Sequence, residues 1–194
     1  MLGTNDKRST GFMEKLLENK LKCWDSIIGA LGDLIDVACE GDDLGTQNGP
    51  FIDPEMVRKK IKPYYKKLFD HIHSKTRAKI YFHSCGSVVK LIPDLIDAGV
   101  DILNPVQISA AGMDPVYLKK EFGKDICFWG GGIDTQKILP TGTKKQIQDQ
   151  VKRNTEIFGK DGGFVFCTVH NVQNDVPVEN FVTMWETLME VRNY

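Results

Sequence analysis

Hydrophobic and polar positions along the chain follow two periods, and each period predicts one kind of element. Between residues 12 and 31 the apolar positions recur every three or four residues, the spacing of one helix face, and Ser9 or Thr10 stands where a cap belongs. Five short apolar runs predict strands, at 33–39, 78–83, 100–103, 126–129 and 163–167. Because each run is followed by a helical pattern or turn, the sequence predicts an α/β fold of about five parallel βα units.

Capping and breaking residues place the helices between these strands. Asp53-Pro54-Glu55 predicts a helix start, and that helix is expected to kink at Pro63 and to end near Lys75. Ser87 is expected to cap the next helix, which Gly99 ends. That helix is predicted over 87–98, and three more are predicted over 114–122, 143–158 and 178–192. We expect an N-terminal helical segment, 1–32, and a strand-bearing domain, 33–194.

Polar residues and glycines recur where the predicted strands end. They are Glu40 and Asp42, His83 and Cys85, Asn104 and Gln107, Gly130 to Gly132, and Cys167 and His170. Carboxyl ends of parallel strands lie on one face of a sheet, where α/β enzymes carry their active sites. This agreement between strands is a stronger signal than any single motif.

The motif His83-Ser84-Cys85 is the most specific of these pairs. Residues i and i+2 of a strand point to the same side, so both side chains can reach one metal ion. The alternative is a buried histidine beside a buried thiol.

The other strand-end residues suggest a pocket. Glu40 and Asp42, with Asp43 beside them, are candidates for acid/base catalysis or substrate binding. A solvated turn explains these acids as well, since Asp and Gly are ordinary turn residues. Asn104, Gln107 and Gly131 are candidates for substrate binding, and Gly130 to Gly132 would let backbone approach a ligand.

Composition and charge argue against a nucleic-acid-binding, membrane-spanning or disulfide-rich protein. The chain has 194 residues, 41% of them apolar and 26% charged, and a net charge of -1, so no global field favours nucleic acid or anionic lipid. No apolar run approaches the roughly 20 residues that span a membrane, and the N-terminus lacks a signal-peptide core. The five cysteines are scattered and odd in number, which favours a reducing cytoplasm over a disulfide framework.

Four motifs in order resemble the C-terminal part of the uroporphyrinogen decarboxylase family, whose fold is a (β/α)8 barrel. They are His83-Ser84-Cys85-Gly86, the run GVDILNP at 99–105, the run GGGID at 130–134, and residues 163–180 with His170. The resemblance extends from about residue 33 to the C-terminus.

The resemblance implies two alternative activities. Decarboxylases of the family use no metal and hold a tetrapyrrole with arginines of an N-terminal segment, but the five arginines of this chain lie in no such motif. Zinc methyltransferases of the family move methyl groups between methylcorrinoid proteins and thiol or other acceptors. Their His-x-Cys…Cys pattern implies zinc at His83, Cys85 and Cys167. His170 matches a histidine that the decarboxylase branch also carries in its final loop, which implies a catalytic group in the pocket wall. Some of them add a glutamate ligand near the position of Gln107.

The resemblance therefore predicts a zinc-dependent methyltransferase that acts with a corrinoid protein or a small methyl substrate. Tetrapyrrole decarboxylation and a non-catalytic partner-binding remnant stay open as alternatives. A closed barrel needs eight strands and roughly 250 residues, so five units predict a partial barrel. Its open edges would be covered by a second copy, as a homo-oligomer.

Overall fold

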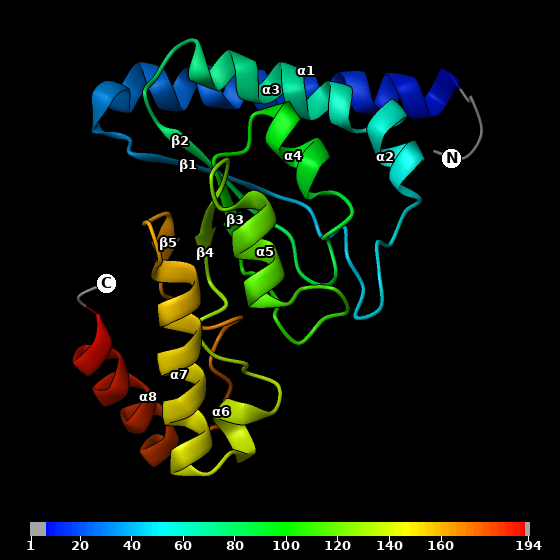
Figure 1. Ribbon diagram of the computed structural model, residues 1–194. Helices are drawn as coiled ribbons and strands as arrows, with labels where there is room; N and C mark the ends of the chain where they lie inside the picture. Colours follow the sequence, from blue (N-terminus) through cyan, green and yellow to red (C-terminus); the bar gives the residue numbers. More distant parts are fainter. Residues whose placement is uncertain (1–6, 193–194) are drawn as a thin grey trace.

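Five strands form one parallel sheet in the computed structural model, which describes residues 7–192 (Figure 1). The strands are β1 (Val37–Gly41), β2 (Lys79–His83), β3 (Ile102–Asn104), β4 (Cys127–Trp129) and β5 (Phe164–Val165). Their order in the sheet is the order in the chain, with β1 and β5 at its edges. This confirms the predicted α/β fold with a five-stranded parallel sheet.

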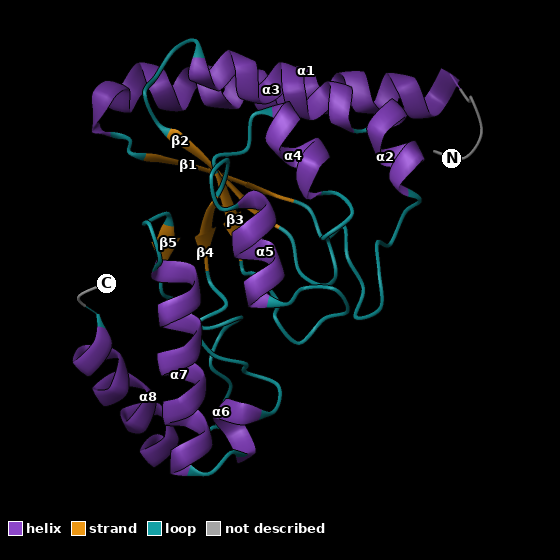
Figure 2. Ribbon diagram, viewed as in Figure 1, coloured by secondary structure: helices purple, strands orange, loops and turns teal. Residues whose placement is uncertain are grey.

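Helices connect the strands and lie on the outer side of the sheet (Figures 1 and 2). They are α1 (Lys7–Leu31), α2 (Pro54–Lys60), α3 (Lys62–His73), α4 (Ile92–Ala98), α5 (Pro115–Phe122), α6 (Ile138–Thr141), α7 (Lys144–Gly159) and α8 (Val178–Val191), with a 3-10 turn, η1, at Gly32–Leu34. Helix α1 packs along α3, and α7 packs along α8. Within residues 7–192, no helix combines the length and apolar character needed to cross a membrane.

Side-chain caps define the starts of three helices among the described residues, α2, α5 and α7. Asp53 accepts hydrogen bonds from the backbone of Glu55 and Met56 at the start of α2, and Thr143 and Gln146 form a capping box on α7. Asp114 likewise caps α5, and Gly99 ends α4 with a φ of 105°.

Several predicted boundaries differ from the structure. The strand predicted at 33–39 begins only at Val37, because Gly32–Leu34 form the 3-10 turn η1. Ser87 does not cap a helix: its hydroxyl donates to the carbonyl of Ala111, and α4 begins only at Ile92. Ser9 and Thr10 lie inside α1, so neither caps it. Instead of a kink at Pro63, the helix is interrupted at Ile61. Pro63 lies in the first turn of a separate helix, α3.

The two faces of the sheet differ in burial. Alternate strand residues such as Ile80, Phe82 and Phe128 are at most 1% exposed beneath the helices. Their neighbours Tyr81 and Trp129 point to the opposite face and stay half-exposed, with ring centroids 5.5 Å apart. The described helices thus cover one face of the sheet, and the other is the inner face of a partial barrel.

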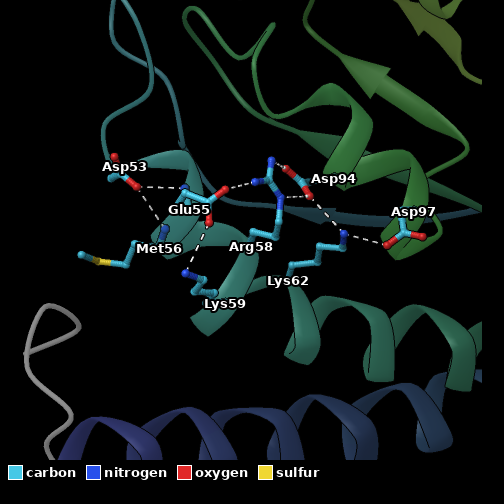
Figure 3. A network of polar contacts seen from close by, with 8 residues as sticks. All are labelled: Asp53, Glu55, Met56, Arg58, Lys59, Lys62, Asp94 and Asp97. Atoms are coloured by element: carbon cyan, nitrogen blue, oxygen red, sulfur yellow. Dashed lines mark hydrogen bonds and ion pairs between the residues drawn. The ribbon is translucent and has the colours of Figure 1, made fainter.

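A network of charges joins α2 and α3 to α4 (Figure 3). Arg58 binds both carboxylate oxygens of Asp94 at 2.9 Å, and Lys62 bridges Asp94 at 3.0 Å and Asp97 at 2.7 Å. Asp94 is only 5% exposed, and its hydrogen bonds from Arg58 hold its pKa below the usual range. The network thus holds α2 and α3, which follow the loop after β1, against α4.

Candidate metal centre

The end of β2 places two metal-binding side chains together. His83 is the last residue of the strand, and Cys85 follows in the turn, with its Sγ 3.3 Å from His83 Nε2. Gly86 turns the chain with a φ of 82°, and a Cβ there would lie 2.5 Å from the backbone of Gly45. Only glycine fits this close approach, which keeps Cys85 beside the strand end.

Asn104 fixes the ring of His83. Its Oδ1 lies 2.7 Å from His83 Nδ1, while its Nδ2 donates to the carbonyl of Trp129 at 2.8 Å. Because the amide nitrogen is used by Trp129, the oxygen faces the imidazole and accepts from Nδ1–H. The lone pair of Nε2 then points toward Cys85, which is the arrangement that metal-binding histidines use.

His170 completes a group of three. One ligand atom from each of His83, Cys85 and His170 lies within 4.8 Å of the others, and the two imidazole centroids are 6.3 Å apart. His170 stands in the loop after β5. That loop is anchored by Val169, which is 2% exposed and whose backbone N–H donates to the carbonyl of Ile133 at 3.1 Å.

The donor set fits zinc. Two imidazole nitrogens and a thiolate are common zinc ligands, and a catalytic zinc keeps a fourth position open. Tetrahedral zinc separates a nitrogen ligand from a sulfur ligand by about 3.6 Å, close to the observed 3.3 Å between His83 and Cys85. Burial raises the pKa of the Cys85 thiol to about 11, and the nearby Asp43 carboxylate adds to this. Metal binding would have to release that proton.

Cys167 is not a member of this group. Its carbonyl accepts from the N–H of Gly132 at 2.9 Å, and its thiol lies half-buried near Tyr81. Burial raises the pKa of Tyr81 to about 12, with contributions from Cys39, Cys167 and Cys85. The geometry of the described residues therefore groups His170 with His83 and Cys85, and zinc binding by Cys167 stays a prediction.

Glu40 and Asp42 bind helices. The Glu40 carboxylate accepts from Trp24 Nε1 at 2.7 Å and pairs with Lys20, which ties β1 to α1. Asp42 accepts from the hydroxyl of Tyr65 on α3 at 2.6 Å, and burial with this carboxylate raises the Tyr65 pKa. Both acids also line a hollow of about 410 Å³ beside His83. Their catalytic role stays a prediction.

The three residues predicted to bind substrate make contacts inside the protein. Asn104 is 6% exposed and holds His83, as described above. Gln107 accepts from the N–H of Gly86 at 2.7 Å and donates to Gln47 at 2.8 Å. The N–H of Gly131 donates to the carbonyl of Pro105 at 2.9 Å. These contacts support the turn after β2 and its neighbours, and substrate contact by these residues stays a prediction.

Asp43 lies closer to the cluster than either predicted acid. Its Oδ1 accepts from the N–H of Cys85 at 3.1 Å and stands 3.8 Å from His83 Nε2. Asp43 is next to Asp42 in the chain, but successive residues of an extended segment point to opposite sides. Alternation along the segment could therefore have predicted that Asp42 faces α3 and Asp43 faces the cluster.

Comparison with known proteins agrees with this architecture. The uroporphyrinogen decarboxylase (URO-D) family profile matches residues 1–191. A solved methyltransferase from Methanosarcina mazei is similar with a TM-score of 0.66 and 19% sequence identity, over 90% of this chain and 47% of that one. The chain thus spans about half the length of the solved structure, and at this identity the likeness shows the fold. No curated protein sequence matches the chain.

Proposed function

The chain belongs to the uroporphyrinogen decarboxylase family, and we propose that it is a zinc-dependent methyltransferase. In this proposal it moves a methyl group between a methylcorrinoid protein and a thiol or another acceptor. The observation that carries the proposal is the group formed by His83, Cys85 and His170 at the carboxyl ends of the strands. The fold shared with the Methanosarcina mazei methyltransferase supports it.

The residues of the cluster would divide the work as follows. His83, Cys85 and His170 would hold the ion, and Asn104 would keep Nε2 of His83 directed at it. Zinc bound there supplies a positive charge that keeps an incoming thiol deprotonated at neutral pH, and a thiolate is the nucleophilic form. The inner face with Tyr81 and Trp129 would shelter the acceptor from water, since both rings stand beside this end of the sheet.

Tetrapyrrole decarboxylation gains no support from the contacts of Arg58, Arg77 and Arg153. A tetrapyrrole decarboxylase needs cationic groups for its substrate's carboxylates. Arg58 binds Asp94 on the helix side, Arg77 donates to the carbonyl of Asp33, and Arg153 lies 3.8 Å from Asp114. We therefore favour metal-dependent methyl transfer, with a corrinoid protein or a small methyl substrate as partner.

Metal content tests the proposal, with matched cysteine variants as controls. Purified wild type should carry about one zinc per chain. Cys85→Ser and His170→Ala should lose it, whereas Cys167→Ser should keep it, because its thiol lies outside the group. If His170→Ala kept zinc and Cys167→Ser lost it, the ligands would instead be His83, Cys85 and Cys167, the set that the family resemblance implies.

Turnover then separates an enzyme from a binding protein. Wild type loaded with zinc should demethylate methylcob(III)alamin in the presence of a small thiol, and Cys85→Ser should not. Absence of zinc in wild type, with no uptake on reconstitution, would refute the zinc proposal. If the protein bound zinc but transferred no methyl group to any thiol, the non-catalytic partner-binding alternative would be favoured.

We also propose that a second copy covers the open edges of the sheet. Strands β1 and β5 are its edge strands, and Cys39 of β1 is exposed on the inner face. Sheet edges with free backbone groups favour pairing with another chain. A homo-oligomer would bury both the edges and the inner face.

A further inference from the structure

We propose that Asp43 supplies a carboxylate ligand to the metal held by His83, Cys85 and His170. The inference rests on the proposed zinc site and adds to it. Three observations carry it: the position of Asp43 relative to His83 and Cys85, the rigidity of the segment that holds it, and the contacts of the two neighbouring acids.

The first observation is distance. Asp43 Oδ1 lies 3.8 Å from His83 Nε2, and Cys85 Sγ lies 3.3 Å from the same nitrogen. Ligand bonds of about 2.1 Å to oxygen and nitrogen place these two atoms about 3.4 Å apart around tetrahedral zinc. The observed separation is a few tenths of an ångström longer. A small rotation of a side chain that is 67% exposed closes that gap.

The second observation is the backbone that holds Asp43. The preceding residue, Asp42, donates its N–H to the carbonyl of His83 at 3.0 Å, which extends the pairing of β1 with β2. The following residue, Leu44, is 5% exposed and donates its N–H to the hydroxyl of Ser84 at 3.0 Å. Asp43 therefore sits between two fixed points and beside the turn that carries Cys85.

The third observation concerns the neighbouring acids. Glu40 is bound by Trp24 and Lys20, and Asp42 by Tyr65, all from helices. Gln107 uses its side-chain oxygen for the N–H of Gly86. The Asp43 carboxylate, in contrast, faces the two residues of the His-x-Cys motif: it accepts from the N–H of Cys85 and lies 3.8 Å from His83 Nε2. A carboxylate directed at a histidine and a cysteine is a suitable oxygen ligand for zinc.

A carboxylate in this place would occupy the fourth position while substrate is absent. Zinc prefers four ligands, and His83, Cys85 and His170 provide three. Because the Asp43 side chain is mostly exposed, it can rotate away and leave its position to a substrate thiol. Asp43 would thereby keep the ion in place between turnovers.

Cobalt substitution and zinc affinity test the inference without an activity assay. Asp43→Asn retains an oxygen that accepts from Cys85 N–H, so the turn is kept while the anionic ligand is lost. We expect zinc affinity, measured by chelator competition, to fall roughly tenfold or more. The visible d–d bands of the Co²⁺ protein should also shift, and they should shift in wild type when a small alkyl thiol is added.

Asp42→Asn is the matched control, because it removes the same charge one residue away from a side chain that binds Tyr65. Its zinc affinity and cobalt spectrum should stay those of wild type. Equal affinity and identical cobalt spectra for Asp43→Asn and wild type would overturn the inference while leaving the three-residue site intact. Failure of wild type to bind zinc or cobalt would instead refute the proposed zinc site itself, and Asp43 with it.

Discussion

Replacing Asn104 by alanine should weaken zinc binding by roughly 10- to 100-fold, the usual effect of removing a residue that orients a metal-binding histidine. The side chain of Asn104 accepts from His83 Nδ1 at 2.7 Å and donates to the carbonyl of Trp129 at 2.8 Å. Without it, His83 can turn its ring or change the nitrogen that carries the proton. A 10- to 100-fold loss corresponds to about 1.4 to 2.7 kcal/mol of binding free energy.

The same substitution should also lower the stability of the metal-free protein. Asn104 is 6% exposed, so its removal leaves the Trp129 carbonyl without its donor in a largely buried place. An unsatisfied buried polar group costs about 1–3 kcal/mol. For a chain of this length that corresponds to a decrease in melting temperature of roughly 2–12 °C.

Asn104→Asp separates the two effects. A carboxylate still accepts from His83 Nδ1–H but cannot donate to Trp129, so zinc affinity should be retained while stability falls. Chelator competition measures the affinity, and thermal unfolding without metal measures the stability. Wild-type zinc affinity in Asn104→Ala, or equal losses of affinity in both variants, would refute the proposed orienting role.

Two further predictions concern the charge network and the open sheet. Asp94→Asn should lower stability at pH 7 by about 2 kcal/mol, because a buried carboxylate loses its charged hydrogen bonds from Arg58 and Lys62. Because Arg58 lowers the folded-state pKa of Asp94, the stabilisation by the Asp94 carboxylate is complete above its unfolded pKa of about 3.9 and is lost as the pH falls through its folded pKa. Urea unfolding between pH 7 and pH 2 should therefore show that the stability difference between wild type and Asp94→Asn shrinks below about pH 4. A difference that stays constant over this range would contradict the argument. Light scattering over a range of concentrations should find a dimer or larger assembly, and a monomer at every concentration would contradict the proposed covering of the sheet edges.

Local signals in the sequence were sufficient for the five strands, their order and the longer helices, but not for η1, α6 or the separation of α2 from α3. Strand-forming runs, Asp-Pro helix starts and the Thr143–Gln146 capping box each act over a few residues, so they can be read without knowledge of the fold. Ser87 shows the limit of this approach. Its sequence context is that of a helix cap, but its hydroxyl is used by Ala111, a residue that only the folded structure brings close.

The third potential ligand depended on tertiary structure in the same way. Regular alternation beyond β5, which ends at Val165, directs Cys167 to the inner face, where its thiol lies near Tyr81 but outside the group around His83. Beyond Cys167, Val169 is buried, and its neighbour His170 is thereby directed to the cluster. Sequence alone indicates a histidine and a cysteine near this strand end, but not which of them approaches His83.

The curvature of the sheet explains how β2 and the loop after β5 can build one site. Three strand spacings in a flat sheet correspond to about 14 Å, whereas the rings of His83 and His170 are 6.3 Å apart. Parallel pairing continues past the end of β5, since Gly132 donates to Cys167 and Ile133 pairs with Thr168. This extension carries the chain back over the mouth of the partial barrel to His83. All four proposed ligands therefore come from one chain, so zinc affinity should be independent of whether two copies associate.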